Sequence, residues 1–132
     1  MNRETIREMT MQLVYQMDAS DTFDASELSL IEEDAAVINK KQAADTLSAI
    51  RDHHEEIDEL ISNNLEKWTF DRIAKTDLAR MRTAVAEMLY LDKIPSAVSI
   101  NEAVRLAKKY SDDNSYKFVN SVLGKIERSL EK

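Results

Sequence analysis

The sequence contains no cysteine, and this absence excludes several kinds of functional site. Without thiols the chain has no disulfide framework, no thiolate zinc site and no cysteine nucleophile. No apolar run approaches the ~18 residues that a membrane span requires. The N-terminal segment carries Glu4 and Glu8 and lacks the apolar stretch of a signal peptide. We therefore expect a cytoplasmic protein that makes no contact with a membrane.

Glycine and proline are almost as scarce, with one of each in the chain, at Gly124 and Pro95. Sheets and hairpins use these residues at their turns, so the scarcity predicts an all-α fold. The 132 residues are expected to form one domain, residues 1–132. A chain of this length buries about two-thirds of its unfolded surface and needs no covalent staple.

Hydrophobic periodicity predicts about six or seven helices. The first runs from about Arg3 to Met17, and a short helix starts near Ser26. The strongest pattern is an apolar stripe with alternating spacings of four and three residues, typical of a long amphipathic helix. The stripe consists of Ala43, Leu47, Ile50, His54, Ile57 and Ile61.

The remaining helices are expected in the second half of the chain. Residues 70–89 form one helix, or two with a break near Lys75, in which case Thr76 would cap the second. Ser99 stands three residues before Glu102, the spacing of a capping box, so a helix is expected to begin near Ser99. The candidate caps of the last helix are Asp113, Asn114 and Ser115.

Charge is distributed unevenly around a net value of −7. Residues 18–60 hold thirteen acids against three bases, whereas residues 61–132 hold ten acids against thirteen bases. The acidic total argues against a nonspecific nucleic-acid binder, whose affinity depends on neutralising phosphates. It leaves room for a local basic patch in the C-terminal helices. The cations of that patch are Arg105, Lys108, Lys109, Lys117, Lys125 and Arg128, with Tyr110, Tyr116 and Phe118 among them.

Aromatic side chains beside cations suit single-stranded RNA, because bases stack on the rings and phosphates pair with the charges. Each of these residues also has a structural interpretation. Phe118 falls at helical spacing with Val119 and Val122, which favours a core position. The lysines and arginines would by default form solvated helix faces.

No pattern in the sequence predicts catalysis. The chain has no glycine-rich phosphate loop, no nucleophile elbow and no carboxylate pair at a catalytic spacing, so we expect no enzyme and no cofactor. His53, His54 and Asp58 suggest a metal site, but one helix offers no clear third ligand, and we expect no metal. His54 is better explained as a packed histidine on the stripe. Trp68 is predicted to anchor the core.

Several motifs together resemble the NusB family of bacterial transcription antitermination factors. They extend over nearly the entire chain, and the C-terminal blocks are the strongest matches. The motifs are Arg7-Glu8 with Gln12 and Tyr15, then Trp68, Asp77, Met81-Arg82 and Glu87, then residues 94–109 and 117–123.

The resemblance implies a NusB-like domain of two perpendicular three-helix bundles that is not an enzyme. It implies binding to the boxA segment of ribosomal RNA leaders, as a heterodimer with the small-subunit ribosomal protein NusE, in the transcription elongation complex. The positions that resemble the RNA-binding face of the family are Arg3, Arg7, Tyr110, Lys117 and Phe118. Asp77, with Arg80 as a weaker neighbour, resembles the partner-binding position.

Some features depart from this pattern or admit another interpretation. Glu4 and Thr5 interrupt an N-terminus that is often rich in arginine, which weakens the expected RNA affinity of the chain alone. Asp77 is expected to serve the partner interface rather than stability, but it could simply pair with Arg80 or Arg82. An alternative function is a protein-interaction or homodimeric helical module with weak RNA binding. The same domain also precedes the catalytic domain of some RNA cytosine methyltransferases, for which this chain has no room.

Overall fold

The computed structural model describes residues 1–67 and 69–131, and every regular element in that part of the chain is helical. The predicted all-α fold is therefore confirmed. Trp68, predicted to anchor the core, lies outside the described residues. The elements are α1 (Arg3–Ala19), η1 (Ala25–Glu27), α2 (Glu32–Ile38), α3 (Lys41–Asn63), η2 (Phe70–Arg72), α4 (Lys75–Tyr90), α5 (Ser96–Tyr110) and α6 (Asp113–Leu130).

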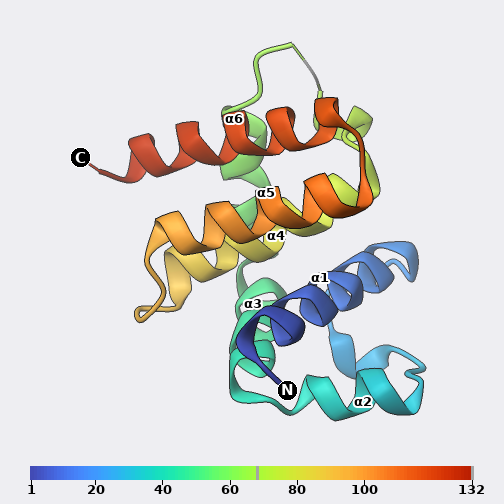
Figure 1. Ribbon diagram of the computed structural model, residues 1–132. Helices are drawn as coiled ribbons and strands as arrows, with labels where there is room; N and C mark the ends of the chain where they lie inside the picture. Colours follow the sequence, from blue (N-terminus) through green and yellow to red (C-terminus); the bar gives the residue numbers. More distant parts are fainter. Residues whose placement is uncertain (68, 132) are drawn as a thin grey trace.

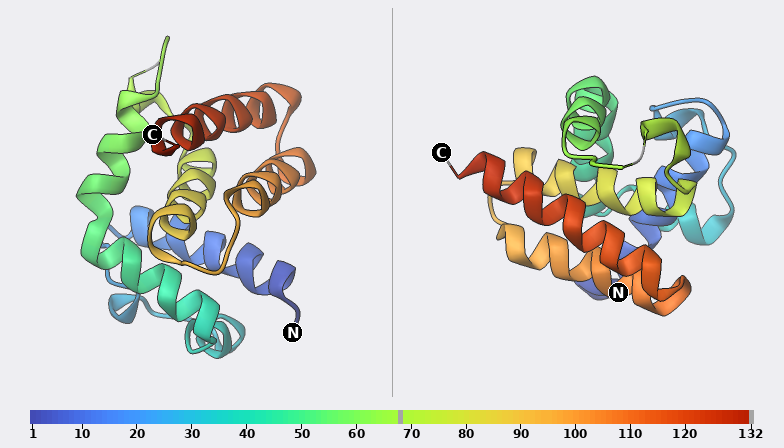
Figure 2. Two further views of the ribbon diagram at one scale, coloured as in Figure 1. Left: turned by 90° about the vertical axis from the view of Figure 1, so that its left-hand side faces the viewer. Right: turned by 90° about the horizontal axis from the view of Figure 1, so that it is seen from above.

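The helices form two groups of three, as the resemblance implied. Helices α1, α2 and α3 pack together at one end, and α4, α5 and α6 pack together at the other (Figure 1). The left view of Figure 2 shows α4 and α5 nearly along their axes, while α1 and α3 run across the picture. Helix α4 also packs against α1 and α3, so it joins the two groups. Accordingly, every residue from Asp77 to Glu87 is buried.

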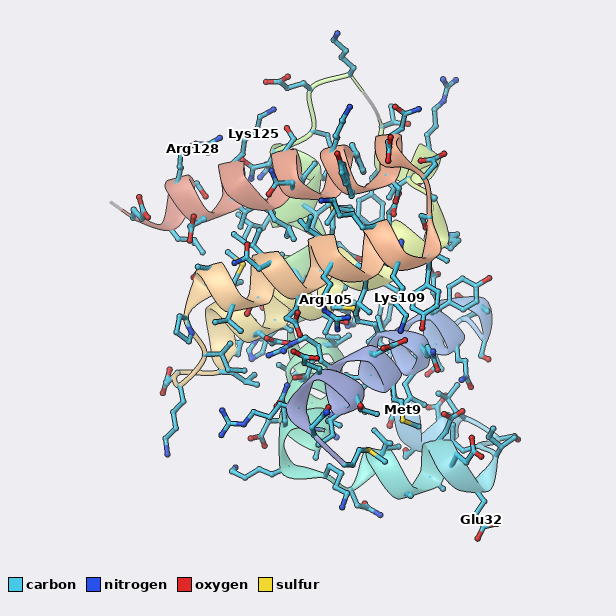
Figure 3. The ribbon with its side chains drawn as sticks, in the orientation of Figure 1. Met9, Glu32, Arg105, Lys109, Lys125 and Arg128 are labelled. Atoms are coloured by element: carbon cyan, nitrogen blue, oxygen red, sulfur yellow. The ribbon has the colours of Figure 1, made fainter. Side chains whose placement is uncertain are left out.

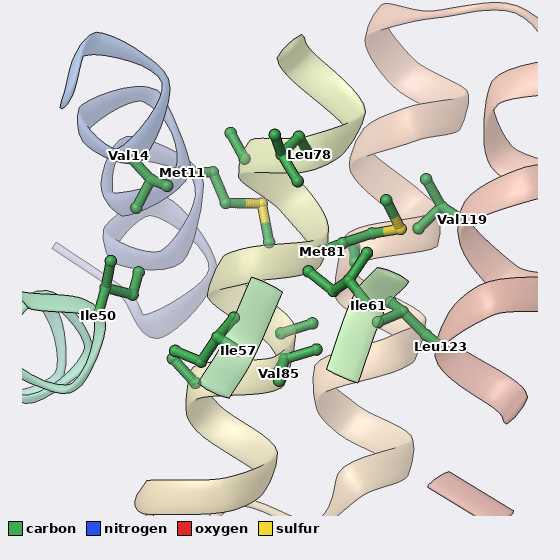
Figure 4. Packing of buried hydrophobic residues seen from close by; sticks show 14 of the residues in the cluster. Met11, Val14, Ile50, Ile57, Ile61, Leu78, Met81, Val85, Val119 and Leu123 are labelled. Carbon is green, nitrogen blue, oxygen red and sulfur yellow. The ribbon is translucent and has the colours of Figure 1, made fainter. Parts of the chain in front are cut away.

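The apolar stripe of α3 lies in the core, as predicted. Its aliphatic members are all buried and contact side chains from the other helices (Figure 4). His54 is half-buried, and its ring stacks on Phe23 with the ring centres 3.9 Å apart. The backbone of α3 is non-helical at His53, with φ −131° and ψ 19°, so the long helix bends beside this stacked pair.

The predicted start of α5 is wrong by three residues. The helix begins at Ser96 with Pro95 at its N-cap, and Ser99 is completely buried inside it. The Ser99 hydroxyl donates a 2.8 Å hydrogen bond to Glu87 of α4 instead of capping its own helix. Glu102 pairs with Arg105. The fixed φ of Pro95 suits a helix start, and the tertiary acceptor on α4 takes the hydroxyl.

Two further caps differ from expectation. Asp112, one residue before the predicted candidates, caps α6 by accepting a 2.9 Å hydrogen bond from the Ser115 backbone N–H. The break between η2 and α4 is present, but Thr76 lies inside α4, whose N-cap is Ala74. The predicted helix at Ser26 is the single turn η1.

Candidate functional site

The C-terminal end of α5 meets α1 through an aromatic ring and two charges. Tyr110, the last residue of α5, is 56% exposed, and its hydroxyl donates a hydrogen bond to Glu8 of α1. The Lys109 Nζ lies 3.7 Å from the Glu8 carboxylate and 4.9 Å from the centre of the Tyr110 ring. Tyr110 and then Glu8 raise the pKa of Lys109 above its ordinary value. Figure 3 shows Arg105 and Lys109 on the side of α5 that faces α1. An exposed ring and a cation are thus held together by one carboxylate.

A groove of about 390 Å³ opens beside this contact, between α1, α4 and α5. Buried Met11, Ala79 and Leu106 give it apolar walls, and exposed Tyr15 and Tyr110 stand at its edge. Arg80 also lines it, so the groove brings a predicted partner-binding residue next to a predicted RNA-binding residue. The full lining is Glu8, Met11, Gln12, Tyr15, Gln16, Thr76, Ala79, Arg80, Leu106 and Tyr110.

Asp77 precedes the groove residue Arg80 by three residues on α4 and is 7% exposed. Its carboxylate pairs with Arg80 at 3.0 Å and accepts a hydrogen bond from the Ser115 hydroxyl. Arg80 also donates to the Ser111 hydroxyl at 3.2 Å. These contacts tie α4 to the turn between α5 and α6 and to the first turn of α6. Asp77 therefore does pair with Arg80, which is the structural alternative to an interface role.

Arg7 points into the protein, not toward solvent. It is 5% exposed, and its guanidinium donates to both carboxylate oxygens of Glu87, at 2.8 and 3.0 Å. A second carboxylate, that of Glu102, lies 3.6 Å away. A buried carboxylate such as Glu87 needs a cation beside it, which explains where the arginine points. The expectation that Arg7 presents its charge to RNA is not supported by this geometry.

The other predicted RNA-binding residues are spread over separate surfaces. Lys117 is exposed on α6, and Phe118 beside it is half-buried and packs against the core. Arg3 is exposed at the start of α1 and lines a different hollow, of about 1220 Å³, next to the loop before α5. The structure thus places Tyr110 and Arg80 along the same groove, whereas Arg3 lies at a different hollow.

The basic residues of the C-terminal helices form two groups, not one patch. Lys109 faces α1, and Lys108 lies 4.7 Å from the centre of the Tyr116 ring. Lys125 and Arg128 lie along the edge of α6 far from α1 (Figure 3), and Lys125 pairs with Glu66 at 2.6 Å. Of these cations, Lys109 adjoins the groove through its contact with Glu8.

Three groove residues, Glu8, Gln12 and Tyr15, received no role from sequence reasoning. They follow one another at spacings of four and three residues on α1, which places them on one helix face. All three belong to the opening motif of the resemblance. That spacing, together with the polar character of all three, was the signal that could have identified this face.

The histidines of α3 are engaged in packing. The His53 Nδ1 lies 2.8 Å from Glu56, and its ring stacks on Tyr90 with centres 4.0 Å apart. Asp58 makes two 2.8 Å hydrogen bonds with Arg82.

Within residues 1–67 and 69–131, no three metal-ligating side chains come together. In the same part of the chain, no helix has the length and apolar character to span a membrane.

Comparison with known proteins decides the family. The model of the NusB family matches residues 4–128. The chain belongs to the NusB family. It is 41% identical over 133 residues to the transcription antitermination protein NusB of Bacillus velezensis, covering 99% of each chain. It is 40% identical to the NusB protein of Bacillus subtilis strain 168, covering 99% of this chain and 98% of the other.

Solved structures agree with the family assignment. A crystal form of T. maritima NusB superposes with a TM-score of 0.81 at 32% identity, covering 97% of this chain and 92% of that one. A crystal structure of antitermination factors NusB and NusE in complex with dsRNA gives a TM-score of 0.80 at 27% identity, covering 96% of each chain. The resemblance inferred from the motifs is therefore confirmed.

Proposed function

We propose that this NusB-family protein is a transcription antitermination factor that binds boxA-type single-stranded RNA of ribosomal RNA leaders together with NusE. The proposed role is binding within the transcription elongation complex, without catalysis. The names of the relatives support it, as does the similar solved structure of NusB and NusE in complex with dsRNA, which joins the same two proteins to an RNA.

The observation that carries the proposal is the groove between α1, α4 and α5. It offers apolar walls and two exposed tyrosines to a protein partner, with Arg80 at one side. Tyr110 lies at the edge of the groove, and Lys109 lies against the Tyr110 ring. An RNA base would stack on this ring, and a neighbouring phosphate would pair with the Lys109 ammonium. A partner in the groove and an RNA strand at Tyr110 would be neighbours. This adjacency explains why RNA would be held by both proteins jointly.

The residues proposed to contact RNA are Tyr110, Lys117 and Arg3, which are exposed, together with the half-buried Phe118. Arg7 is proposed instead to hold α1 in place through Glu87. Arg80 is proposed to face the partner, and Asp77 to fix the orientation of Arg80 through their 3.0 Å contact.

Reconstituted transcription tests the proposal. RNA polymerase transcribes a template with a ribosomal leader before a terminator, in the presence of NusE and the other elongation factors. Adding this protein is expected to raise the fraction of transcripts that pass the terminator. A matched template with a scrambled boxA segment serves as the control. Equal readthrough on both templates would contradict the proposal.

The alternative is a protein-interaction or homodimeric module with weak RNA binding. The burial of Arg7 and the pairing of Lys109 with Glu8 favour it, because both remove cations from the RNA surface. Sedimentation of the protein alone, and with NusE, separates the cases. A stable homodimer that excludes NusE would favour this alternative.

A further inference from the structure

Glu8 occupies the point where α1 meets the end of α5. Its side chain is 20% exposed and lines the groove. It accepts the hydrogen bond from the Tyr110 hydroxyl and lies 3.7 Å from the Lys109 Nζ. Lys109 in turn lies against the Tyr110 ring, 4.9 Å from its centre. The Glu8 carboxylate therefore engages both Tyr110 and Lys109, the two groups that would hold RNA at the end of α5.

This arrangement opposes RNA in three ways. A phosphate that approaches Lys109 also approaches the negative charge of Glu8, and like charges at such distances repel. The Lys109 charge is already partly neutralised by Glu8. The Tyr110 ring is tethered by its hydroxyl, and its contact with the Lys109 ammonium competes with a stacked base.

We propose that Glu8 is an inhibitory latch, which holds Tyr110 and Lys109 against α1 and lowers the affinity of the isolated protein for single-stranded RNA. The inference rests on the proposed function, because it concerns the regulation of the same Tyr110 surface. RNA binding by the protein would then depend on a second group that replaces Glu8 as the partner of Tyr110 and Lys109, or that binds Glu8 in their place.

The experiment measures binding of a fluorescent single-stranded boxA-type RNA by anisotropy. Glu8→Gln removes the charge and keeps an oxygen that can accept from Tyr110. It is expected to tighten binding roughly three- to tenfold, the effect of removing one like charge about 4 Å from a phosphate. Tyr110→Phe removes the tethering hydroxyl and keeps the ring, so it is also expected to tighten binding. Tyr110→Ala removes the ring and is expected to weaken it.

Glu4→Gln is the matched control. Glu4 lies one turn earlier on α1, is exposed, and makes no ion pair among the described residues. Its neutralisation changes the net charge equally, and screening at physiological salt should keep the effect below about twofold. Circular dichroism and urea unfolding check each variant. If Glu8→Gln does not fold, Tyr110→Phe carries the same test.

The outcomes separate the latch from the proposed function. Unchanged or weaker binding by both Glu8→Gln and Tyr110→Phe, with weaker binding by Tyr110→Ala, overturns the latch and leaves the RNA function standing. Absence of RNA binding by every variant, with and without NusE, overturns both. An equal gain from Glu4→Gln and Glu8→Gln shows a general charge effect and also overturns the latch.

Discussion

Arg7 and Glu87 lie 80 residues apart in the chain and form a buried ion pair that joins α1 to α4. Their side chains are 5% and 1% exposed, and two hydrogen bonds connect them. Ser99 of α5 completes the site by donating to the same carboxylate at 2.8 Å. Three helices from both halves of the fold therefore meet at Glu87.

Removing one member of this pair should be costly. Arg7→Met leaves the Glu87 charge buried without its partner, and we expect a loss of roughly 3–5 kcal/mol in the free energy of unfolding. The double variant Arg7→Met, Glu87→Met should lose less than the sum of the two single changes. Urea unfolding followed by circular dichroism measures both. A loss below about 1 kcal/mol for Arg7→Met would contradict a structural role.

The apolar stripe of α3 gives a second stability prediction. Leu47 is 5% exposed, so Leu47→Ala should cost roughly 2–5 kcal/mol through lost burial and a cavity. Ser48 is exposed on the same helix, and Ser48→Ala is the control expected to change stability by less than about 0.5 kcal/mol. Equal unfolding midpoints for the two variants would mean that the stripe does not form the core.

The helices of this fold could be predicted from sequence because their signals are local. The stripe from Ala43 to Ile61 repeats over several turns, and its period alone places it on one helix face. Cap positions could not be predicted equally well, because tertiary partners compete for the same side chains. Ser99 has the spacing of a capping box, yet the Glu87 carboxylate on another helix takes its hydroxyl.

The candidate site was accessible to sequence reasoning only in part. Tyr110 and Arg80 were singled out, but their adjacency depends on how α1, α4 and α5 pack, which no local pattern encodes. Arg7 was placed on the RNA-binding face only through the resemblance, because nothing in its local sequence indicates that its charge is buried. Its partner Glu87 is far away in the chain, so only the folded structure shows that the charge is buried.

Asp77 is predicted to matter for stability as well as for the partner. With 7% exposure and its contact to Arg80, Asp77→Ala would leave a buried guanidinium without its carboxylate. We expect a loss of roughly 2–4 kcal/mol in the free energy of unfolding. Asp71→Ala, which removes an exposed carboxylate from η2, is the matched control.

Partner binding by Asp77→Ala should be measured with NusE at a temperature where the variant is folded. Weaker binding per folded molecule is expected, since Arg80 would lose the contact that orients it toward the groove. Unchanged stability of Asp77→Ala would show that the pair with Arg80 contributes nothing to the fold. Unchanged NusE binding would remove Asp77 from the interface.

Tyr110 and Lys117 should affect RNA binding differently. Tyr110→Ala is expected to cost roughly 1–3 kcal/mol of binding free energy if a base stacks on the ring. Lys117→Ala should weaken binding to boxA-type RNA and to scrambled RNA by the same factor, because a phosphate contact carries no sequence information. Affinities of both variants for boxA-type and scrambled RNA, in complex with NusE, distinguish the two roles. A sequence-dependent effect of Lys117→Ala would contradict its assignment to a phosphate.

The central claim is that this protein and NusE hold single-stranded RNA jointly, and the salt dependence of RNA affinity tests it most directly. The logarithm of affinity falls with the logarithm of salt concentration by about 0.7 for each phosphate engaged on a single strand. The slope should be shallow for the protein alone and steeper for its complex with NusE, and Lys117→Ala should reduce the steeper slope by about one contact. Identical slopes with and without NusE, unaffected by Lys117→Ala, would contradict the claim.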